Sequence, residues 1–151
     1  MKKINYGYIP DIIDETNHYV LGASKLPQKV LRLDGQWLDY LPEEEPQRKQ
    51  VETYNCTSFN TLNDIEILFE EVFGAERNFS DRFTGITAGT KPPGNSPHIV
   101  AEAIRKNGLI REELLPFADS ILTAEEYYSP NPLPRSLRKE GQQFLKKYFS
   151  F

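Results

Sequence analysis

The chain has 151 residues and a mass of 17.4 kDa, the size of one ordinary domain, which excludes most multidomain enzymes. Hydrophobic residues make up 38% and charged residues 26%, so there is enough apolar surface to fold and too little charge bias for intrinsic disorder. The formal net charge is −4, and this acidic balance argues against nucleic acid as the main ligand.

Cysteine and histidine are scarce, which limits the chemistry. The single cysteine, Cys56, excludes an internal disulfide and a cysteine-rich zinc site. Only His18 and His98 are left as imidazole ligands, and we expect no metal or cofactor. No signal-peptide pattern follows Met1, and no stretch approaches the roughly 20 apolar residues of a membrane span. We therefore expect no membrane contact and a cytoplasmic or virion-associated protein.

The first part of the chain has no sustained helical period and carries scattered prolines. This pattern predicts an extended N-terminal arm over residues 1–55, with one short strand. Apolar side chains that would hold the arm to a core are Leu31, Leu33, Trp37, Leu38, Tyr40 and Leu41. Residues 56–151 are expected to form a helical lobe, and the whole chain a single compact domain.

The strongest helical signal runs from Cys56 to Phe73, where apolar residues recur every three or four positions. This face consists of Phe59, Leu62, Ile65, Phe69 and Val72, widened by Ile67, Leu68 and Phe73. Such a wide stripe predicts a central, buried helix. Asn55 is placed to cap its start, and Gly74 to end it in the left-handed conformation.

Capping residues mark two further helices. Ser80 is placed to cap a short helix, and Ser96 caps a clearer one that has Pro97 at its first position and ends at Gly108. The apolar face of the second of these helices is Ile99, Val100, Ala103 and Ile104.

Two helical segments are predicted near the end of the chain. Thr123 and Glu126 have capping-box spacing, which predicts a short helical turn. After a proline-rich stretch at 130–134, a last helix is expected from Ser136 to Tyr148.

Cys56 is the candidate nucleophile because it opens a helix. A thiol there lies beside unpaired backbone N–H groups and the positive end of the helix dipole, which favour the thiolate. The alternative is that Cys56 is a small buried hydrophobic side chain. Acyl transfer also needs donors aimed at the developing oxyanion, and the amide of Gln47 or Gln50 could supply one beside the Cys56 N–H.

A series of motifs has the order found in a known family. Residues 46–50 (PQRKQ), followed by 55–59 (NCTSF) at the start of a long apolar helix, resemble the nucleophile region of papain-like cysteine peptidases. The likeness is greatest to the divergent forms of phage and metagenomic sequences. The same order continues through a short helix at 80–83, a loop at 94–97, a helix and turn at 101–110 and the stretch 115–117 (LPF).

The resemblance implies roles for particular residues. Cys56 matches the nucleophile, and Gly94 and Asn95 match the loop whose backbone pairs with an extended substrate. Pro97 would flank a hydrophobic specificity pocket. The chain departs from the family at Thr57, where a bulky aromatic residue usually follows the nucleophile.

The oxyanion residue and the fold class also follow from the resemblance. Gln50 lies six residues before the cysteine, the spacing common in the family, whereas Gln47 has the better local context after a proline, and the choice stays open with a slight preference for Gln47. The implied fold is α+β and mainly α: the helical lobe of a papain-like fold with a central cysteine-bearing helix and an extended arm, without the sheet-rich second lobe.

The main departure is the general base. In the family its histidine and the orienting asparagine lie downstream on the second lobe, and this chain ends near the point where that lobe would begin. His98 opens a helix near the cleft loop, but its position does not match the base, and His18 lies in the arm. Without a base, acyl transfer loses about 10²–10⁴ in rate.

Two hypotheses follow. The first is a peptidase half-site that attacks a polypeptide substrate, with the base supplied by another chain or by missing sequence, and hence an oligomer or a complex with a second lobe. The second is an inactive papain-like module with a structural or binding role, for example in a virion, in which Cys56 is a relic.

Overall fold

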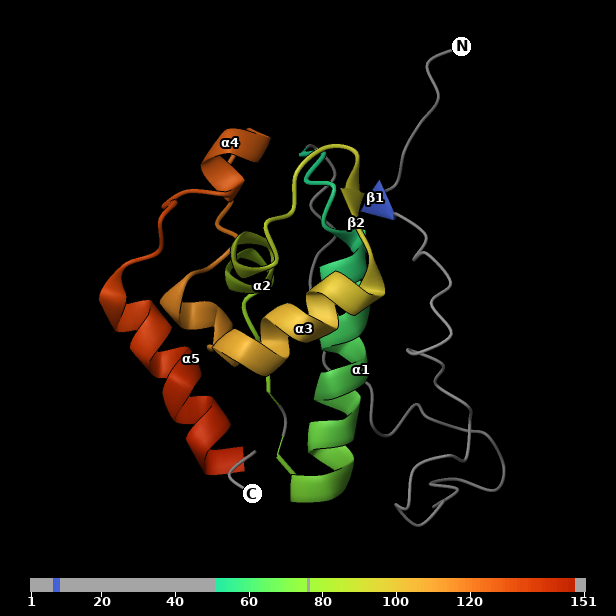
Figure 1. The fold of residues 1–151 in the computed structure, drawn as a ribbon, viewed down its shortest axis with the longest axis vertical. Helices are drawn as coiled ribbons and strands as arrows, with labels where there is room; N and C mark the ends of the chain where they lie inside the picture. The colour runs from blue at the N-terminus through green and yellow to red at the C-terminus, as the bar shows by residue number, and fades with distance from the viewer. Residues whose placement is uncertain (1–6, 9–50, 76, 149–151) are drawn as a thin grey trace.

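A computed structural model describes residues 7–8, 51–75 and 77–148, and within them the fold is mainly helical (Figure 1). The expected predominance of helix is therefore confirmed for this part of the chain. The elements in chain order are β1 (Gly7–Tyr8), α1 (Cys56–Phe73), α2 (Asp81–Thr87), β2 (Gly94–Asn95), α3 (Pro97–Asn107), the 3-10 turn η3 (Glu112–Leu114), α4 (Ala124–Tyr127) and α5 (Arg135–Tyr148). Most of the predicted N-terminal arm lies outside the described residues.

Helix α1 has the predicted bounds. It ends because Gly74 adopts a φ of 59° and donates its N–H to the carbonyl of Glu70 at 2.8 Å, a left-handed C-cap. The expectation that α1 is buried on most sides is wrong for its second half, where Leu68 is 50% exposed and Val72 64% exposed. Packing partners cover only the side that carries Leu62 and Phe69.

Helices α2 and α3 begin where their caps predict. The Ser80 hydroxyl accepts the N–H of Phe83 at 3.2 Å, and the Ser96 hydroxyl accepts the N–H of Ile99 at 3.3 Å. Pro97 opens α3, where its missing N–H costs nothing. One detail differs from the prediction: the Ile99 side chain is exposed, because the packed face of α3 consists of Val100, Ala103 and Ile104.

The predicted capping box at α4 is confirmed. The Thr123 hydroxyl accepts the Glu126 N–H at 3.2 Å, and the Glu126 carboxylate accepts the Thr123 N–H at 3.0 Å. These bonds hold a four-residue helix that carries Tyr127 into the interior, where its side chain is fully buried. The last helix, α5, starts at Arg135, one residue before the predicted position.

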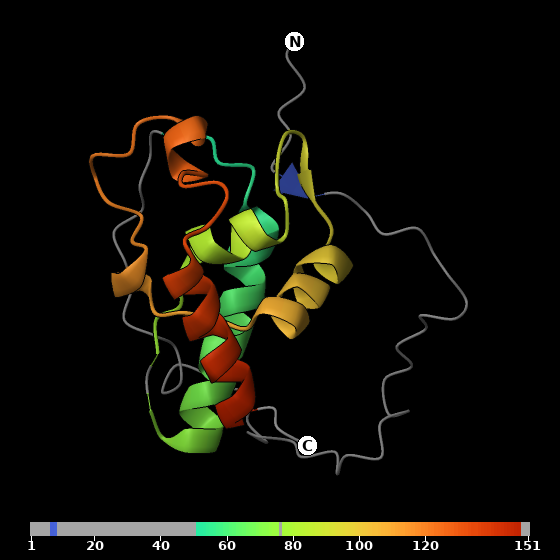
Figure 2. The same cartoon turned by 60° about the vertical axis from the view of Figure 1, so that its left-hand side comes forward.

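The core consists of two apolar clusters. The first joins α1, α3 and Phe79 through Leu62, Phe69, Val100, Ile104 and Leu109, and the second groups Phe83 and Ile86 of α2 with Ile110, Leu115 and Leu133. Helix α5 lies beside α1 (Figure 2). It contributes Phe144 and Tyr148 to the first cluster and Leu137 to the second. It therefore ties the two clusters together.

A close backbone contact seats α5 against the end of α3. A Cβ atom on Gly141 would lie 2.2 Å from the Asn107 carbonyl oxygen, and one on Gly108 would lie 1.9 Å from the Gly141 oxygen. Gly108 also has a φ of 73°. Only glycine at both positions permits this approach.

The two strands form a minimal parallel pair at the start of α1 (Figure 1). Gly7 pairs with Gly94 and Tyr8 with Asn95, and both strands contact α1. None of the helices in the described ranges is both long enough and apolar enough to cross a membrane.

Candidate active site around Cys56

Asn55, the residue before α1, joins the start of this helix to α2 and α4. It is almost completely buried, and its amide nitrogen donates to the Asp81 carbonyl at 3.0 Å and to the Tyr127 hydroxyl at 2.8 Å. The amide is therefore directed at α2 and α4, and the predicted side-chain cap of α1 does not form. Gly85 leaves space for this arrangement, since a Cβ there would lie 2.8 Å from the Asn55 oxygen.

Cys56 is the first residue of α1 and is partly buried. Its backbone N–H belongs to the first turn, where helices have no intrahelical acceptor. Tyr128 lies in the same neighbourhood, because its hydroxyl donates a short hydrogen bond to the carbonyl of Thr53, three residues before the thiol. The sequence prediction did not include Tyr128, which is 72 positions from Cys56 and carries no local motif.

Tyr128 remains a neutral phenol. Burial raises its pKa well above the ordinary value of 10.0, the charge of Cys56 raises it further, and a hydrogen bond with Thr90 only partly opposes this. A phenol with so high a pKa cannot accept the proton of a thiol at neutral pH. Tyr128 can therefore position the chain before Cys56, but it is not the missing general base.

The strand β2 lies against the first turn of α1. The Thr57 hydroxyl donates to the Asn95 carbonyl at 3.0 Å, which holds the strand beside the helix start. The Asn95 amide donates to the Ala88 carbonyl at 3.0 Å and to the Thr90 hydroxyl at 3.2 Å, and its oxygen accepts the Ser96 N–H at 2.9 Å. These bonds hold the Asn95 side chain inside its own loop. The backbone of β2 is the part that pairs with β1.

The structure thus places the first turn of α1, which begins with Cys56, against the strand that consists of Gly94 and Asn95. Pro97 is exposed at the start of α3, two residues beyond β2. Gln47 and Gln50 lie outside the described residues. His98 is partly buried, and within the described residues no hydrogen bond joins it to Cys56.

Several buried polar atoms at the α1–α2 contact have no hydrogen-bond partner among the described residues. They are the amide oxygen of Asn55 and the hydroxyls of Ser58 and Thr84. Each such atom costs about 1–3 kcal/mol compared with an apolar group of the same shape. The contact between α1 and α2 therefore keeps polar atoms at positions where aliphatic groups would be more stable.

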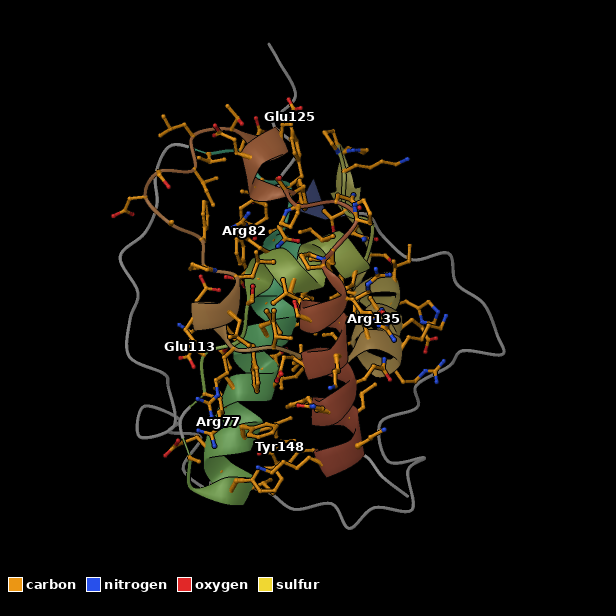
Figure 3. All side chains as sticks on the ribbon, turned by 90° about the vertical axis from the view of Figure 1, so that its left-hand side faces the viewer. Arg77, Arg82, Glu113, Glu125, Arg135 and Tyr148 are labelled. Atoms are coloured by element: carbon orange, nitrogen blue, oxygen red, sulfur yellow. The ribbon has the colours of Figure 1, made fainter. Side chains whose placement is uncertain are left out.

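Two grooves lie elsewhere on the described surface. Two adjoining grooves of about 380 and 610 Å³ share the segments 77–79 and 109–114, and the larger one extends along α5. Arg77 and Tyr148 line it at the lower end of α1 and α5 (Figure 3). Neither groove includes Cys56, Asn95 or Pro97. Within the described ranges no group of three His, Cys, Asp or Glu side chains is placed to hold a metal ion.

Comparison of the chain with protein-family models, with curated proteins and with solved structures finds no match.

Proposed function

We propose that this chain is the nucleophile-bearing helical half of a papain-like cysteine peptidase, in which the Cys56 thiolate attacks a peptide carbonyl carbon. The observation that carries the proposal is the position of Cys56 at the first turn of α1, with β2 held against the same turn through Thr57 and Asn95. A nucleophile and an edge for an extended peptide are thereby adjacent.

The β1–β2 pair supports the substrate role of the loop. Gly7–Tyr8 lies along Gly94–Asn95 in register, so this backbone edge accepts an extended segment beside Cys56. An extended substrate would use the same hydrogen-bonding groups. It would therefore have to take the place of β1.

In the proposed reaction the Cys56 sulfur adds to the carbonyl carbon, and the resulting oxyanion accepts hydrogen bonds from the Cys56 N–H and from the amide of Gln47 or Gln50. The C–N bond then breaks, the amine leaves with a proton from the base, and water hydrolyses the thioester. The base is supplied by another chain or by sequence outside this one.

A second candidate function is an inactive papain-like module with a structural or binding role, for example in a virion. The observation that favours it is that His98, the only described histidine, has no hydrogen bond to Cys56. In this case Cys56 would behave as an ordinary thiol.

The two functions are distinguished by the alkylation rate of Cys56 with iodoacetamide at pH 6, where an ordinary thiol is almost wholly protonated. The matched control is the Cys56→Ser, Ser120→Cys chain, which carries its only thiol in an exposed loop. If Cys56 is an activated nucleophile, it reacts about tenfold faster or more than the control thiol. An equal or slower rate would contradict the peptidase proposal and favour the inactive module.

A further inference from the structure

The larger of the two grooves has an aromatic wall. It lies between α5 and the segments 77–79 and 109–114, and its volume of about 610 Å³ is in the range of small-molecule sites. Three of its lining rings are in mutual contact: the Phe144 ring lies 5.5 Å from that of Phe79 and 5.0 Å from that of Tyr148. Leu114, which is 45% exposed, lines it as well. A further aromatic ring can pack against such a wall.

A short backbone ladder adds charged side chains to the same groove. Phe79 and Arg111 form an antiparallel bridge. Opposed residues of such a pair share one face, and the residues two positions away return to it, so Arg77 and Glu113 belong to the face of Phe79 and Arg111. All four line the larger groove. The ladder therefore places two guanidinium groups beside the aromatic wall.

Two cations meet at the Tyr148 hydroxyl, at one end of this groove. Hydrogen bonds from Lys147 and from Arg77 to that hydroxyl lower the pKa of Tyr148 below its ordinary value of 10.0. The Lys147 ammonium also lies 4.9 Å from the centre of the Tyr148 ring. Figure 3 shows Arg77 near Tyr148 at the lower end of α1 and α5. This end of the groove therefore carries two positive charges next to a phenol.

The charges that line the larger groove are positive on balance. The cations are Arg77, Arg111 and Lys147, and the carboxylates are Glu113 and Glu140. Glu113 forms an ion pair with Arg111 at 3.2 Å. Glu140 lies seven residues before Lys147 on α5, about 10 Å away along the helix axis at 1.5 Å per residue. The end at Lys147 thus favours an anion, and the two carboxylates disfavour a multiply charged one.

From these observations we propose that the groove binds a small aromatic carboxylate, with its carboxylate group between Arg77 and Lys147 and its ring against Phe144. A guanidinium group can donate two parallel hydrogen bonds to a carboxylate, and the ammonium group adds a third donor. The ligand ring would cover apolar atoms of the wall and remove water from them. The proposal is independent of the proposed peptidase function, because Cys56 does not line the groove.

A matched pair of probes tests the proposal in the full chain. Naphthylacetate and naphthylacetamide share one ring system and differ in charge, and amide NMR spectra of the isotopically labelled protein report where each binds. We expect naphthylacetate to shift amides of 77–79, 109–114 and α5 and to saturate. It should bind roughly fivefold more tightly than naphthylacetamide at low salt. The difference should shrink at high salt.

Substitutions locate the carboxylate group. Arg77→Gln and Lys147→Gln should each bring the affinity for naphthylacetate towards that for naphthylacetamide. Gln143→Glu adds a carboxylate to the lining without a change of shape, and should weaken the binding of naphthylacetate alone. The matched control is Arg138→Gln, an exposed cation of α5 that lines neither groove, which should change neither affinity. Far-UV circular dichroism checks that each variant is folded.

Several results would overturn the proposal. They are equal affinities for the two probes, no saturable shift from either probe, and shifts confined to residues outside the groove. An unchanged affinity for naphthylacetate in both Lys147→Gln and Gln143→Glu would do the same. These two side chains are exposed, so the test holds even if Arg77→Gln does not fold.

Discussion

Arg82 shows how one buried charged side chain organises the region behind the candidate site. Its guanidinium donates to the carbonyls of Tyr127 at 2.8 Å, Pro116 at 2.7 Å and Glu126 at 3.1 Å, and also to the carbonyl of Ser129. It thereby ties α2 to the chain around α4 (Figure 3). Burial lowers the pKa of Arg82, but an arginine remains charged at any physiological pH.

The first prediction concerns these four bonds. Arg82→Met leaves the carbonyls without their donor, and hydrogen bonds to a charged group contribute more than neutral ones, so we expect a loss of about 2–4 kcal/mol in the free energy of unfolding. Urea titration followed by circular dichroism measures it. Arg82→Lys keeps the charge but not the planar fork, and should recover only part of the loss. An unchanged unfolding midpoint for Arg82→Met would contradict this role.

At the level of single residues, the sequence predicted Cys56 as the first residue of its helix but not its surroundings. Asn55 donates to Tyr127 and Tyr128 donates to the carbonyl of Thr53, so both hydrogen bonds join positions more than 70 residues apart. Such bonds depend on how the elements pack, and no local pattern encodes them. The failed cap at Asn55 has the same cause, because more distant partners took its amide.

At the level of elements, helix ends were predictable because caps are local. Ser96 with Pro97, Thr123 with Glu126, and Gly74 each satisfy backbone groups within a few residues of themselves. Which side of α1 is buried was not predictable in the same way. Its apolar residues extend around the helix, and only the positions of α3, α5 and residue 79 decide that Leu62 and Phe69 are covered while Val72 is not.

The surface of α3 provides a prediction about pH. The Glu102 carboxylate accepts two hydrogen bonds from Arg105, at 2.7 and 2.9 Å, and lies 3.4 Å from the Lys106 ammonium. The hydrogen bonds from Arg105 are the main reason why the pKa of Glu102 falls from 4.5 to about 2. Because the folded-state pKa is the lower one, the stabilisation is present above about pH 4.5 and is lost as the pH falls towards 2.

Carbon-detected NMR of the Glu102 carboxyl group measures this titration directly. Arg105→Gln should move the midpoint back towards 4.5, whereas Lys106→Gln, which removes only the longer contact, should move it less. Both shifts should shrink at high salt because the groups lie at the surface. A midpoint near 4.5 in the unmodified protein would show that the ion pair does not persist in solution.

At the level of the whole molecule, α5 is the element that spans both apolar clusters, although Gly141 is its only buried residue. Its Phe144 ring lies 5.8 Å from that of Phe69 and 5.5 Å from that of Phe79. These contacts depend on the close approach of its backbone to Asn107. The docking of α5 is therefore sensitive to a single added methyl group.

Gly141→Ala tests this dependence. Alanine is favoured over glycine inside a helix by about 1 kcal/mol, but the new methyl would lie 2.2 Å from the Asn107 oxygen and 3.0 Å from the Phe83 ring. We expect the clash to dominate, with a net loss of about 1–3 kcal/mol and faster amide hydrogen exchange across α5. Gln143→Ala, on the exposed side of the same helix, should change neither quantity. A stabilised Gly141→Ala protein would mean that the two helices separate at little cost.

The pairing of β1 with β2 has a consequence for the order of folding. It joins two positions separated by more than half the chain, whereas the packed helix pairs α1–α2, α2–α3, α1–α3 and α3–α5 are closer together in sequence. Closing so long a loop costs entropy, and a pair of two-residue strands repays little of it. We therefore expect the helices to assemble first and β1 to attach last and detach first. The β2 edge beside Cys56 would then be uncovered by a local opening, at a free energy well below that of global unfolding.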